Sequence, residues 1–262
     1  MLLALDIGNT SIKGGLFDGA TLARTFRLGS PLMDAGALML ELAEQLQGQK
    51  LNRAGISSVV PRTVPALRAA VESVAGLAPI LIHAGLPLPF ELCYETPETL
   101  GADRLAAAAA GWVLFGAASQ PPRPVVVIDA GTAINYEVVR PPGAYLGGSI
   151  APGPALLMES LARGTAQLPP VPLEMPPEII GRSTRAALQA GIMAGCIDGA
   201  RGMLRRIEAR LGERPYVVST GGWSPLLKAH MPEIDHLEPD LVLHGVRILI
   251  ETADTPAPVT RV

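Results

Sequence analysis

The sequence predicts an α/β protein built from two similar halves, with a ligand-binding cleft between them. Apolar residues make up 48% of the 262 positions but aromatic residues only 4%, which favours close-packed helix and sheet layers of Ala, Leu, Val and Ile. In addition, an apolar run that ends in Asp-x-Gly occurs twice, and a third apolar run ends in a glycine pair. We place the boundary near residue 116, so that the predicted domains cover residues 1–116 and 117–262.

The first copy of the motif opens the chain. The apolar residues 1–5 lead into Asp6-Ile7-Gly8-Asn9-Thr10, which predicts a buried strand followed by a tight polar turn. A second strand begins near Ser11-Ile12-Lys13, so the two strands form a hairpin whose turn faces a ligand.

Strands and helices are then expected to alternate. The pattern predicts strands over residues 21–27 and 55–60, the second ended by Pro61, and helices over residues 38–46 and 63–74. The Ala-rich segment from Ala102 to Phe115 has high helix propensity and almost no polar face, which predicts a buried helix that joins the halves.

The second copy of the motif follows a proline-rich stretch. Val125 to Ile128 form an apolar run that leads into Asp129-Ala130-Gly131-Thr132-Ala133, and Asp129 lies 129 − 6 = 123 residues after Asp6. A third strand, over residues 216–220, ends at the pair Gly221-Gly222.

Turns of this kind suit the phosphates of ATP. Glycine permits a sharp turn and the close backbone approach that a phosphate needs, which fits Gly8 and Gly131. Asp6 and Asp129 would place carboxylates at strand ends, where hard cations bridge protein and phosphate, and Lys13 would supply a positive charge. A lone Asp-x-Gly is most often an ordinary turn. Two copies in matching context, together with the glycine pair, favour a kinase.

A kinase for an alcohol also needs a group that accepts or orients the hydroxyl proton. Asp103 is the best candidate because it begins the Ala-rich helix, and the adjacent Arg104 would bind an acidic substrate. The alternative interpretation is that Asp103 caps the helix and Arg104 is a solvated surface residue.

Charge and cysteine content argue against several classes of protein. A net charge of −3 and scattered arginines argue against nucleic-acid binding. The N-terminus has no basic leader and Asp6 interrupts its apolar run, so we expect a cytoplasmic protein without a membrane span.

Cys93 and Cys196 have no metal-ligand spacing and are predicted to be two buried, unpaired thiols. The Gly-rich residues 145–153 are predicted to form a loop, either at the substrate or dimer side or as a simple connector.

Taken together, five motifs resemble those of type III pantothenate kinases, in that family's order. They are Asp6 to Lys13, Gly101-Ala102-Asp103-Arg104, Asp129 to Ala133, Tyr145 to Gly153 and Gly181-Arg182-Ser183-Thr184. The resemblance runs from Met1 to about Gly245, and the combination is far more specific than any one motif.

The resemblance implies two actin-like (ribonuclease H-like) domains of the acetate-kinase, sugar-kinase and actin type. It also implies transfer of the ATP γ-phosphate to pantothenate, the first step of coenzyme A synthesis. A homodimer that needs Mg²⁺ and a monovalent cation, K⁺ or NH₄⁺, is expected on the same ground.

The resemblance also assigns roles to residues. Asp103 would be the proton acceptor, Asp129 would bind the monovalent cation and Thr132 would touch ATP. The phosphates would be lined by Asp6, Ile7, Gly8, Asn9, Thr10, Ser11, Ile12 and Lys13. Pantothenate would be held by Tyr94, Gly101, Ala102, Asp103, Arg104 and Thr184. Asn135 and Glu137 depart from the Thr and Asp that the family more often has, which affects the expected cation and phosphate geometry.

Three rival functions are weighed against this interpretation. A kinase for another alcohol would keep the glycine turns, but Gly101 to Arg104 argue against it. A non-catalytic regulatory relative would tolerate loss of Asp103 and should show a basic face. An ATP-driven chaperone or cytoskeletal protein would need a longer chain.

Overall fold

The computed structural model describes residues 1–29 and 34–254, which form two compact units. Of the described residues, unit 1 comprises 1–29, 34–119, 139–146 and 240–254, whereas unit 2 comprises 120–138 and 147–239. The chain therefore returns to unit 1 twice after the predicted boundary near residue 116. One return has a clear cause, because helix α8 (Leu241–Ala253) packs on α3 (Ala102–Gly111) and on β1 (Leu2–Ile7). The division into folding domains at residue 116 stays a prediction.

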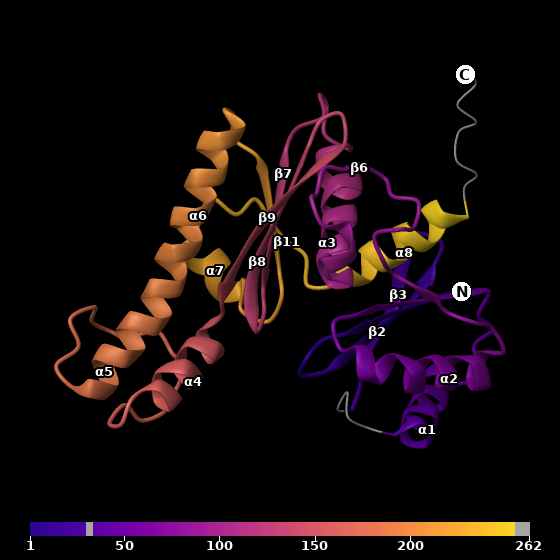
Figure 1. Cartoon of the computed structure of the whole chain (residues 1–262), viewed down its shortest axis with the longest axis horizontal. Coiled ribbons are helices and arrows are strands. Elements are labelled where there is room, and N and C mark those ends of the chain that lie inside the picture. The colour runs from indigo at the N-terminus through magenta and orange to yellow at the C-terminus, as the bar shows by residue number, and fades with distance from the viewer. Residues whose placement is uncertain (30–33, 255–262) are drawn as a thin grey trace. The chain divides into compact units, whose positions relative to one another are not determined.

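Unit 1 contains a five-stranded sheet in the order β3-β2-β1-β4-β5 (Figure 1). The strands besides β1 are β2 (Ile12–Asp18), β3 (Thr21–Leu28), β4 (Arg53–Ser58) and β5 (Ile80–Leu81). β1, β2 and β3 pair antiparallel, while β4 and β5 run parallel to β1. The strands predicted at the N-terminus and over residues 21–27 and 55–60 are confirmed.

Helices α1 (Ala35–Leu46) and α2 (Val64–Ala75) cover one face of this sheet and confirm the two predicted amphipathic helices. Alternate residues of β1 face them, as the two-residue period of a strand requires. The buried side chains of this layer include Leu3, Leu5, Ile7, Leu38, Leu42, Leu67 and Val71. Short 3-10 turns at Pro61–Thr63 and Pro97–Thr99 precede α2 and α3.

The Ala-rich segment forms α3, which continues as a π-helical turn over Trp112–Gly116. The prediction of a buried helix is confirmed, since every residue of α3 except Asp103 is buried. Small side chains allow α3 and α8 to lie side by side (Figure 1). At Gly245 of α8 the approach is closest, because a Cβ atom there would lie 1.9 Å from the Ala106 carbonyl oxygen.

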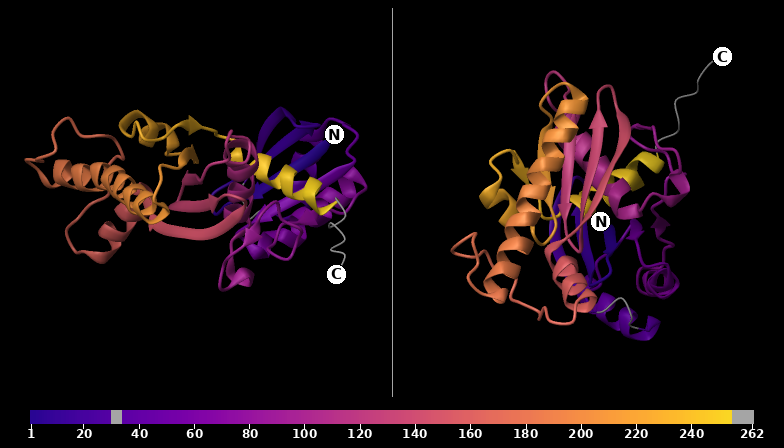
Figure 2. Two further views of the ribbon diagram at one scale, coloured as in Figure 1. Left: turned by 90° about the horizontal axis from the view of Figure 1, so that it is seen from above. Right: turned by 60° about the vertical axis from the view of Figure 1, so that its left-hand side comes forward.

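The second sheet has six strands in the order β11-β10-β7-β8-β9-β6, and its strands other than β6 (Glu91–Leu92) repeat the architecture of the first sheet. These strands are β7 (Val125–Ala130), β8 (Ala133–Arg140), β9 (Ala144–Pro152), β10 (Tyr216–Thr220) and β11 (His236–Leu237). The helices are α4 (Pro154–Gly164), α5 (Thr184–Gln189), α6 (Gly195–Leu211) and α7 (Ser224–His230), with a π-helical turn over Ala190–Ala194. Helix α6 lies along the strands of this sheet in every view (Figure 2), and its apolar face joins their buried core.

The two sheets share one strand order, since β11-β10-β7-β8-β9 corresponds to β5-β4-β1-β2-β3. Asp6 and Asp129 occupy the same place in this repeat, each being the fifth residue of a six-residue strand. Each also stands opposite a hydroxyl residue on the adjacent parallel strand: Asp6 opposite Ser57, and Asp129 opposite Thr220. The repeat predicted from the Asp-x-Gly turns is therefore confirmed.

Two predictions about local structure are wrong. Residues 145–152 are strand, not loop, because Gly148 lets β9 approach β8 so closely that a Cβ atom would lie 1.5 Å from the Tyr136 carbonyl oxygen. The Cys93 thiol is exposed, since it follows the two-residue edge strand β6 (Glu91–Leu92), whereas Cys196 is buried as expected. Both cysteines are unpaired.

Within residues 1–29 and 34–254, no helix is both long and apolar enough to span a bilayer.

The close contact of α3 with α8 makes a prediction. Gly245→Ala should lower the free energy of unfolding by about 1–3 kcal/mol, because two helix backbones must move apart. The matched control is Gly199→Ala, in the interior of α6, where an added Cβ meets nothing within 4 Å. That change should raise stability by about 0.5–1 kcal/mol through helix propensity. Calorimetric unfolding of both variants checks the opposite signs; equal effects would contradict the proposed packing role of Gly245.

Candidate active site

The predicted phosphate turn joins β1 to β2 in unit 1. The Gly8 N–H donates to the Ser11 carbonyl at 3.1 Å, which closes the turn tightly, and Asn9 and Thr10 are exposed at its tip. Asp6 lies at the base of the turn, where its Oδ1 accepts a hydrogen bond of 2.9 Å from the Ser57 hydroxyl. Ser57 was not predicted from sequence, and its position opposite Asp6 on β4 becomes evident only from the strand register.

Two cations flank this turn. The Lys13 ammonium forms an ion pair of 2.9 Å with Asp240, the residue that precedes α8, and both side chains are 25% exposed. Arg27 lies opposite Lys13 on β3 and donates a hydrogen bond of 3.1 Å to the Ser11 hydroxyl. Sequence reasoning found Lys13 but missed Arg27 and Asp240. An anion at the turn would meet both positive charges and would compete with Asp240 for Lys13.

The predicted ATP-binding residues of this segment divide by burial. Ile7 and Ile12 are fully buried (0% exposed) in the core of unit 1, so neither residue presents any surface to a ligand in this structure. The Ile7 carbonyl already accepts a 3.2 Å hydrogen bond from the Val59 N–H. Val59 also lies beside Gly101, since a Cβ atom added at Gly101 would be 3.7 Å from Cγ1 of Val59. The loop after β4 thus connects the phosphate turn to the start of α3.

Asp103 lies in the first turn of α3. Its Oδ1 accepts a 2.7 Å hydrogen bond from the Arg104 backbone N–H, but the N-cap of α3 is Gly101, so Asp103 is not the helix cap that the alternative interpretation expected. Burial nevertheless raises the pKa of the Asp103 carboxyl above its ordinary value of 3.8, against the lowering effect of that N–H and of the Arg104 charge. A partly desolvated carboxylate is a better proton acceptor than one in water, so the hydrogen bond from Arg104 is compatible with a catalytic role.

Arg104 is not a solvated surface residue, since only 8% of it is exposed. Its Nη2 donates to the Tyr145 hydroxyl at 3.3 Å, and its guanidinium carbon lies 6.0 Å from the centre of the Tyr94 ring. The structure thus brings together two predicted substrate-binding residues, Tyr94 and Arg104. The fork of N–H donors on a buried guanidinium suits a carboxylate ligand.

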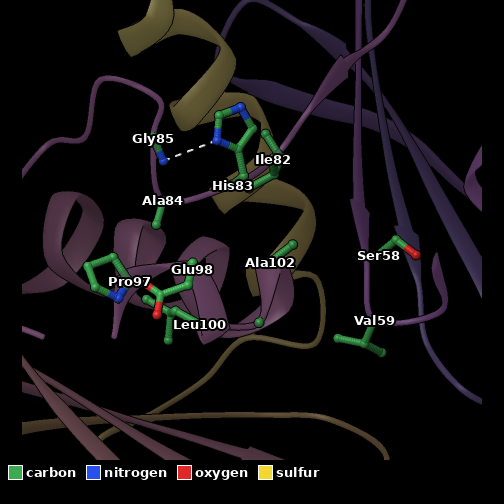
Figure 3. A pocket seen from close by; sticks show the side chains of 11 residues that line it. Ser58, Val59, Ile82, His83, Ala84, Gly85, Pro97, Glu98, Leu100 and Ala102 are labelled. Carbon is green, nitrogen blue, oxygen red and sulfur yellow. Dashed lines mark hydrogen bonds between the residues drawn. The ribbon is translucent and has the colours of Figure 1, made fainter. Parts of the chain in front are cut away.

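A pocket of about 760 Å³ opens beside this helix start (Figure 3). Pro97, Glu98 and Leu100 lie on one side of it and Ser58 and Val59 on the other. Its volume falls within the range of about 300–1,000 Å³ that small-molecule sites occupy. Gly101 and Ala102 contribute to the lining, and the Asp103 carboxyl lies over Gly101, where a Cβ atom would be 2.6 Å from Oδ1.

In unit 2, three segments converge on Asp129. A Cβ atom at Gly221 would lie 2.5 Å from Asp129 Oδ1 and 2.6 Å from the Ala130 carbonyl oxygen. Gly153 approaches equally closely, since its Cβ would lie 2.4 Å from the Gly131 carbonyl oxygen and its N–H donates to the Thr132 carbonyl at 2.9 Å. These positions tolerate only glycine, so the glycine turns found in the sequence do permit close backbone approach.

The oxygens around Asp129 are of the kind that hard cations prefer. Within the described residues, no three His, Cys, Asp or Glu side chains are grouped so as to hold a metal ion. A cation at Asp129 would therefore complete its coordination with carbonyl oxygens and with oxygens of bound substrate. The carboxylate of Asp129 and the carbonyl-rich turn fit that requirement.

The remaining predicted residues also lie in unit 2. Thr132 is exposed just after β7, and Thr184 is exposed in the first turn of α5, whose N-cap Ser183 accepts a hydrogen bond from the Ala186 N–H at 3.2 Å. Glu137, one of the two departures from the family pattern, is 1% exposed on β8. The roles of Thr132 and Thr184 stay predictions.

The desolvation of Asp103 predicts an unusual effect on stability. Because its pKa is raised in the folded state, Asp103 favours folding below its unfolded pKa and opposes it once pH rises through the raised value. Asp103→Asn keeps an oxygen that accepts the Arg104 N–H and removes the charge. We expect a higher unfolding free energy than that of the wild-type protein at pH 8, and we expect this gain to vanish at acid pH.

Denaturant unfolding across pH checks this expectation. Asp18→Asn is the matched control, since Asp18 is exposed at the end of β2 and its replacement should change stability by less than about 0.5 kcal/mol at any pH. A loss of stability in Asp103→Asn at pH 8 would contradict this expectation, because it would show that the negative charge of Asp103 stabilises the start of α3.

Comparison with known proteins agrees with the geometry. The sequence profile of the type III pantothenate kinase family matches residues 2–206. A type III pantothenate kinase of Moorella thermoacetica is 35% identical over 257 residues, covering 96% of this chain and 99% of that protein. One of Dehalococcoides mccartyi is 34% identical over 256 residues, covering 95% and 97%.

Solved structures share the fold at low sequence identity. A structure described as a Baf family transcriptional activator from Campylobacter jejuni has a TM-score of 0.58 at 20% identity, covering 95% of this chain and 97% of that chain. A PilM–PilN type IV pilus biogenesis complex gives 0.53 at 12% identity, with 97% and 99% covered. These likenesses and the repeated sheet order confirm the prediction of two actin-like α/β halves. From the profile and the near full-length relatives it follows that this chain belongs to the type III pantothenate kinase family.

Proposed function

We propose that this protein transfers the γ-phosphoryl group of ATP to the primary hydroxyl of pantothenate, giving 4′-phosphopantothenate and ADP at the first step of coenzyme A synthesis. The observation that carries the proposal is the pairing of a desolvated Asp103 with a buried Arg104 at the start of α3. Pantothenate carries one alcohol for phosphorylation and one carboxylate, and these two residues address both groups. Family membership and the glycine turns support the same reaction.

The residues divide the chemical work. Arg104 binds the carboxylate of pantothenate, and Asp103 accepts the hydroxyl proton as the hydroxyl oxygen bonds to the γ-phosphorus and the bond to the β,γ-bridging oxygen breaks. The turn from Asp6 to Lys13 holds the phosphates through backbone N–H groups and the Lys13 ammonium. The proton thus ends on the carboxylate, and the negative charge that develops lies among fixed positive groups.

Two cations complete the proposed site. Mg²⁺ would neutralise the phosphate charge with the help of Asp6, and a monovalent cation, K⁺ or NH₄⁺, would be held by Asp129 and neighbouring carbonyl oxygens. Asn135 and Glu137 lie on the strand that follows the Asp129 turn, so they are the positions at which cation preference would differ from that of relatives. The predicted cytoplasmic location belongs to the same proposal and is checked by cell fractionation.

Purified protein with ATP, Mg²⁺ and pantothenate should form phosphopantothenate, identified by mass, and K⁺ should stimulate the rate. Asp103→Asn should lower kcat by about 10²–10⁴, the usual contribution of a proton acceptor, while the Kd for ATP stays within about twofold. Asp18→Asn is the control for an Asp-to-Asn replacement at an exposed position and should keep full activity.

Other outcomes of this assay exclude the proposal. Binding of ATP without turnover of pantothenate would favour another alcohol as acceptor or a regulatory role. Unchanged turnover in Asp103→Asn would remove Asp103 from the reaction.

A homodimer is the second part of the proposal. Ile179 and Ile180 are 65% and 79% exposed in the segment before α5, next to the Gly181–Thr184 motif. Two adjacent, strongly exposed isoleucines are typical of a surface that another protein covers, and we assign that surface to a second copy of this chain. The polar neighbours of the motif would then lie at the rim of the interface.

Sedimentation of the wild-type protein should give a dimer. Ile180→Asp should weaken the dimer at least about tenfold, because it buries a charge in the interface. Leu40→Asp, which changes an equally exposed residue (69%) of α1, is the matched control and should leave the dimer intact. A monomeric wild-type protein, or equal effects of the two changes, would contradict this assignment.

A further inference from the structure

Tyr145 lies at the centre of an aromatic cluster beside Arg104. It is fully buried (0% exposed) in the second position of β9. Its ring stacks on Phe90, with centroids 5.6 Å apart and planes inclined by 22°, and it touches the Tyr94 ring at 6.0 Å with an inclination of 50°. Packing on two rings leaves this side chain one rotamer, so its hydroxyl group occupies a fixed place.

The Tyr145 hydroxyl accepts a hydrogen bond of 3.3 Å from Nη2 of Arg104. The same guanidinium group lies over the Tyr94 ring, 6.0 Å from its centre. An arginine side chain has about 2 kcal/mol of rotamer entropy to lose when it is fixed. A rigid acceptor on one side and an aromatic ring on the other reduce that freedom before any ligand binds.

The backbone of Tyr145 also positions Tyr94. In the parallel pairing of β6 with β9, Leu92 stands opposite Tyr145, and the Cys93 N–H donates to the Tyr145 carbonyl at 3.0 Å. Tyr94 is the next residue along the chain. One residue therefore holds two candidate substrate-binding groups: Arg104 through its hydroxyl and Tyr94 through its carbonyl and ring.

We propose that Tyr145 is a positioning residue, which preorganises the Arg104 guanidinium and the Tyr94 ring to bind the carboxylate of the phosphate acceptor. This inference rests on the proposed function and deepens it, since Tyr145 has no role among the predicted site residues. Tyr145 touches neither the transferred phosphate nor the proton, and its contribution lies in the binding of the acceptor.

Such a role separates KM from kcat. Loss of preorganisation weakens acceptor binding in the ground state and the transition state equally, which raises KM for the acceptor and leaves kcat unchanged. The ATP side of the reaction is also unaffected, because the phosphate turn contains none of these rings. A merely structural role would lower activity through the amount of folded protein and would change no KM.

The test compares Tyr145→Phe, which keeps the ring stack and removes only the hydroxyl, with Tyr136→Phe. Tyr136 is likewise buried (1% exposed) but belongs to the core of unit 2, so its change is a control for losing a buried hydroxyl. Tyr145→Phe should raise the KM for pantothenate about tenfold, the loss expected for a hydrogen bond to a charged group. Both variants should keep kcat and the KM for ATP within about twofold.

A double-mutant cycle shows whether the effect acts through Arg104. In an Arg104→Gln background, the change Tyr145→Phe should alter the KM for pantothenate less than twofold, as expected for coupled residues. Additive effects of the two changes, an unaltered KM in Tyr145→Phe, or an equal fall of kcat in both tyrosine variants would overturn the proposal.

Order of the Arg104 side chain is measured without any substrate. In ¹⁵N-labelled protein, the heteronuclear NOE of the Arg104 Nε–H group, assigned with Arg104→Lys, should fall in Tyr145→Phe and stay at the wild-type value in Tyr136→Phe. If pantothenate is not phosphorylated but this NOE falls, the proposed function fails and the positioning role stands. An unchanged NOE contradicts the positioning role whatever the acceptor is.

Discussion

Partial removal of water from Asp103 is the constraint on which the rest of this structure depends. The carboxyl group sits at the start of a helix whose other residues are all buried, and burial raises its pKa more than the Arg104 N–H and charge lower it. The Ala-rich sequence of α3 lets α8 pack closely against it, with the nearest approach between Gly245 and Ala106.

Close backbone approach also shapes the turn that follows Asp129 in unit 2. Around Asp129, Gly153 and Gly221 allow three chain segments to meet at distances that no side chain would permit, and carbonyl oxygens gather beside a carboxylate. Asp6 in unit 1 occupies the equivalent strand position, yet it is bonded to the Ser57 hydroxyl. One repeated strand-and-turn architecture thus provides a carboxylate at the same place in each unit, with different neighbours.

Features that depend on local sequence could be predicted, whereas features that depend on strand pairing or on long-range contacts could not. The Asp-x-Gly turns, the amphipathic helices and the buried Ala-rich helix follow from composition and period, and all are confirmed. Arg27, Ser57 and Asp240 were missed, and Tyr145 was named only as part of a motif, because their neighbours follow from strand register or from a distant return of the chain. The glycines of β9 suggested a loop, since a sequence does not reveal that the neighbouring strand comes too close for a Cβ atom.

The pH dependence of kcat, measured at saturating pantothenate and ATP, tests most directly whether a desolvated Asp103 accepts the proton. The reaction requires the carboxylate form, so activity should be lost as pH falls through the raised pKa, with a midpoint above the ordinary value of 3.8. The residual activity of Asp103→Asn should lack this acid limb. The same acid limb in Asp103→Asn, or full wild-type activity down to the pH at which the protein unfolds, would contradict the assignment.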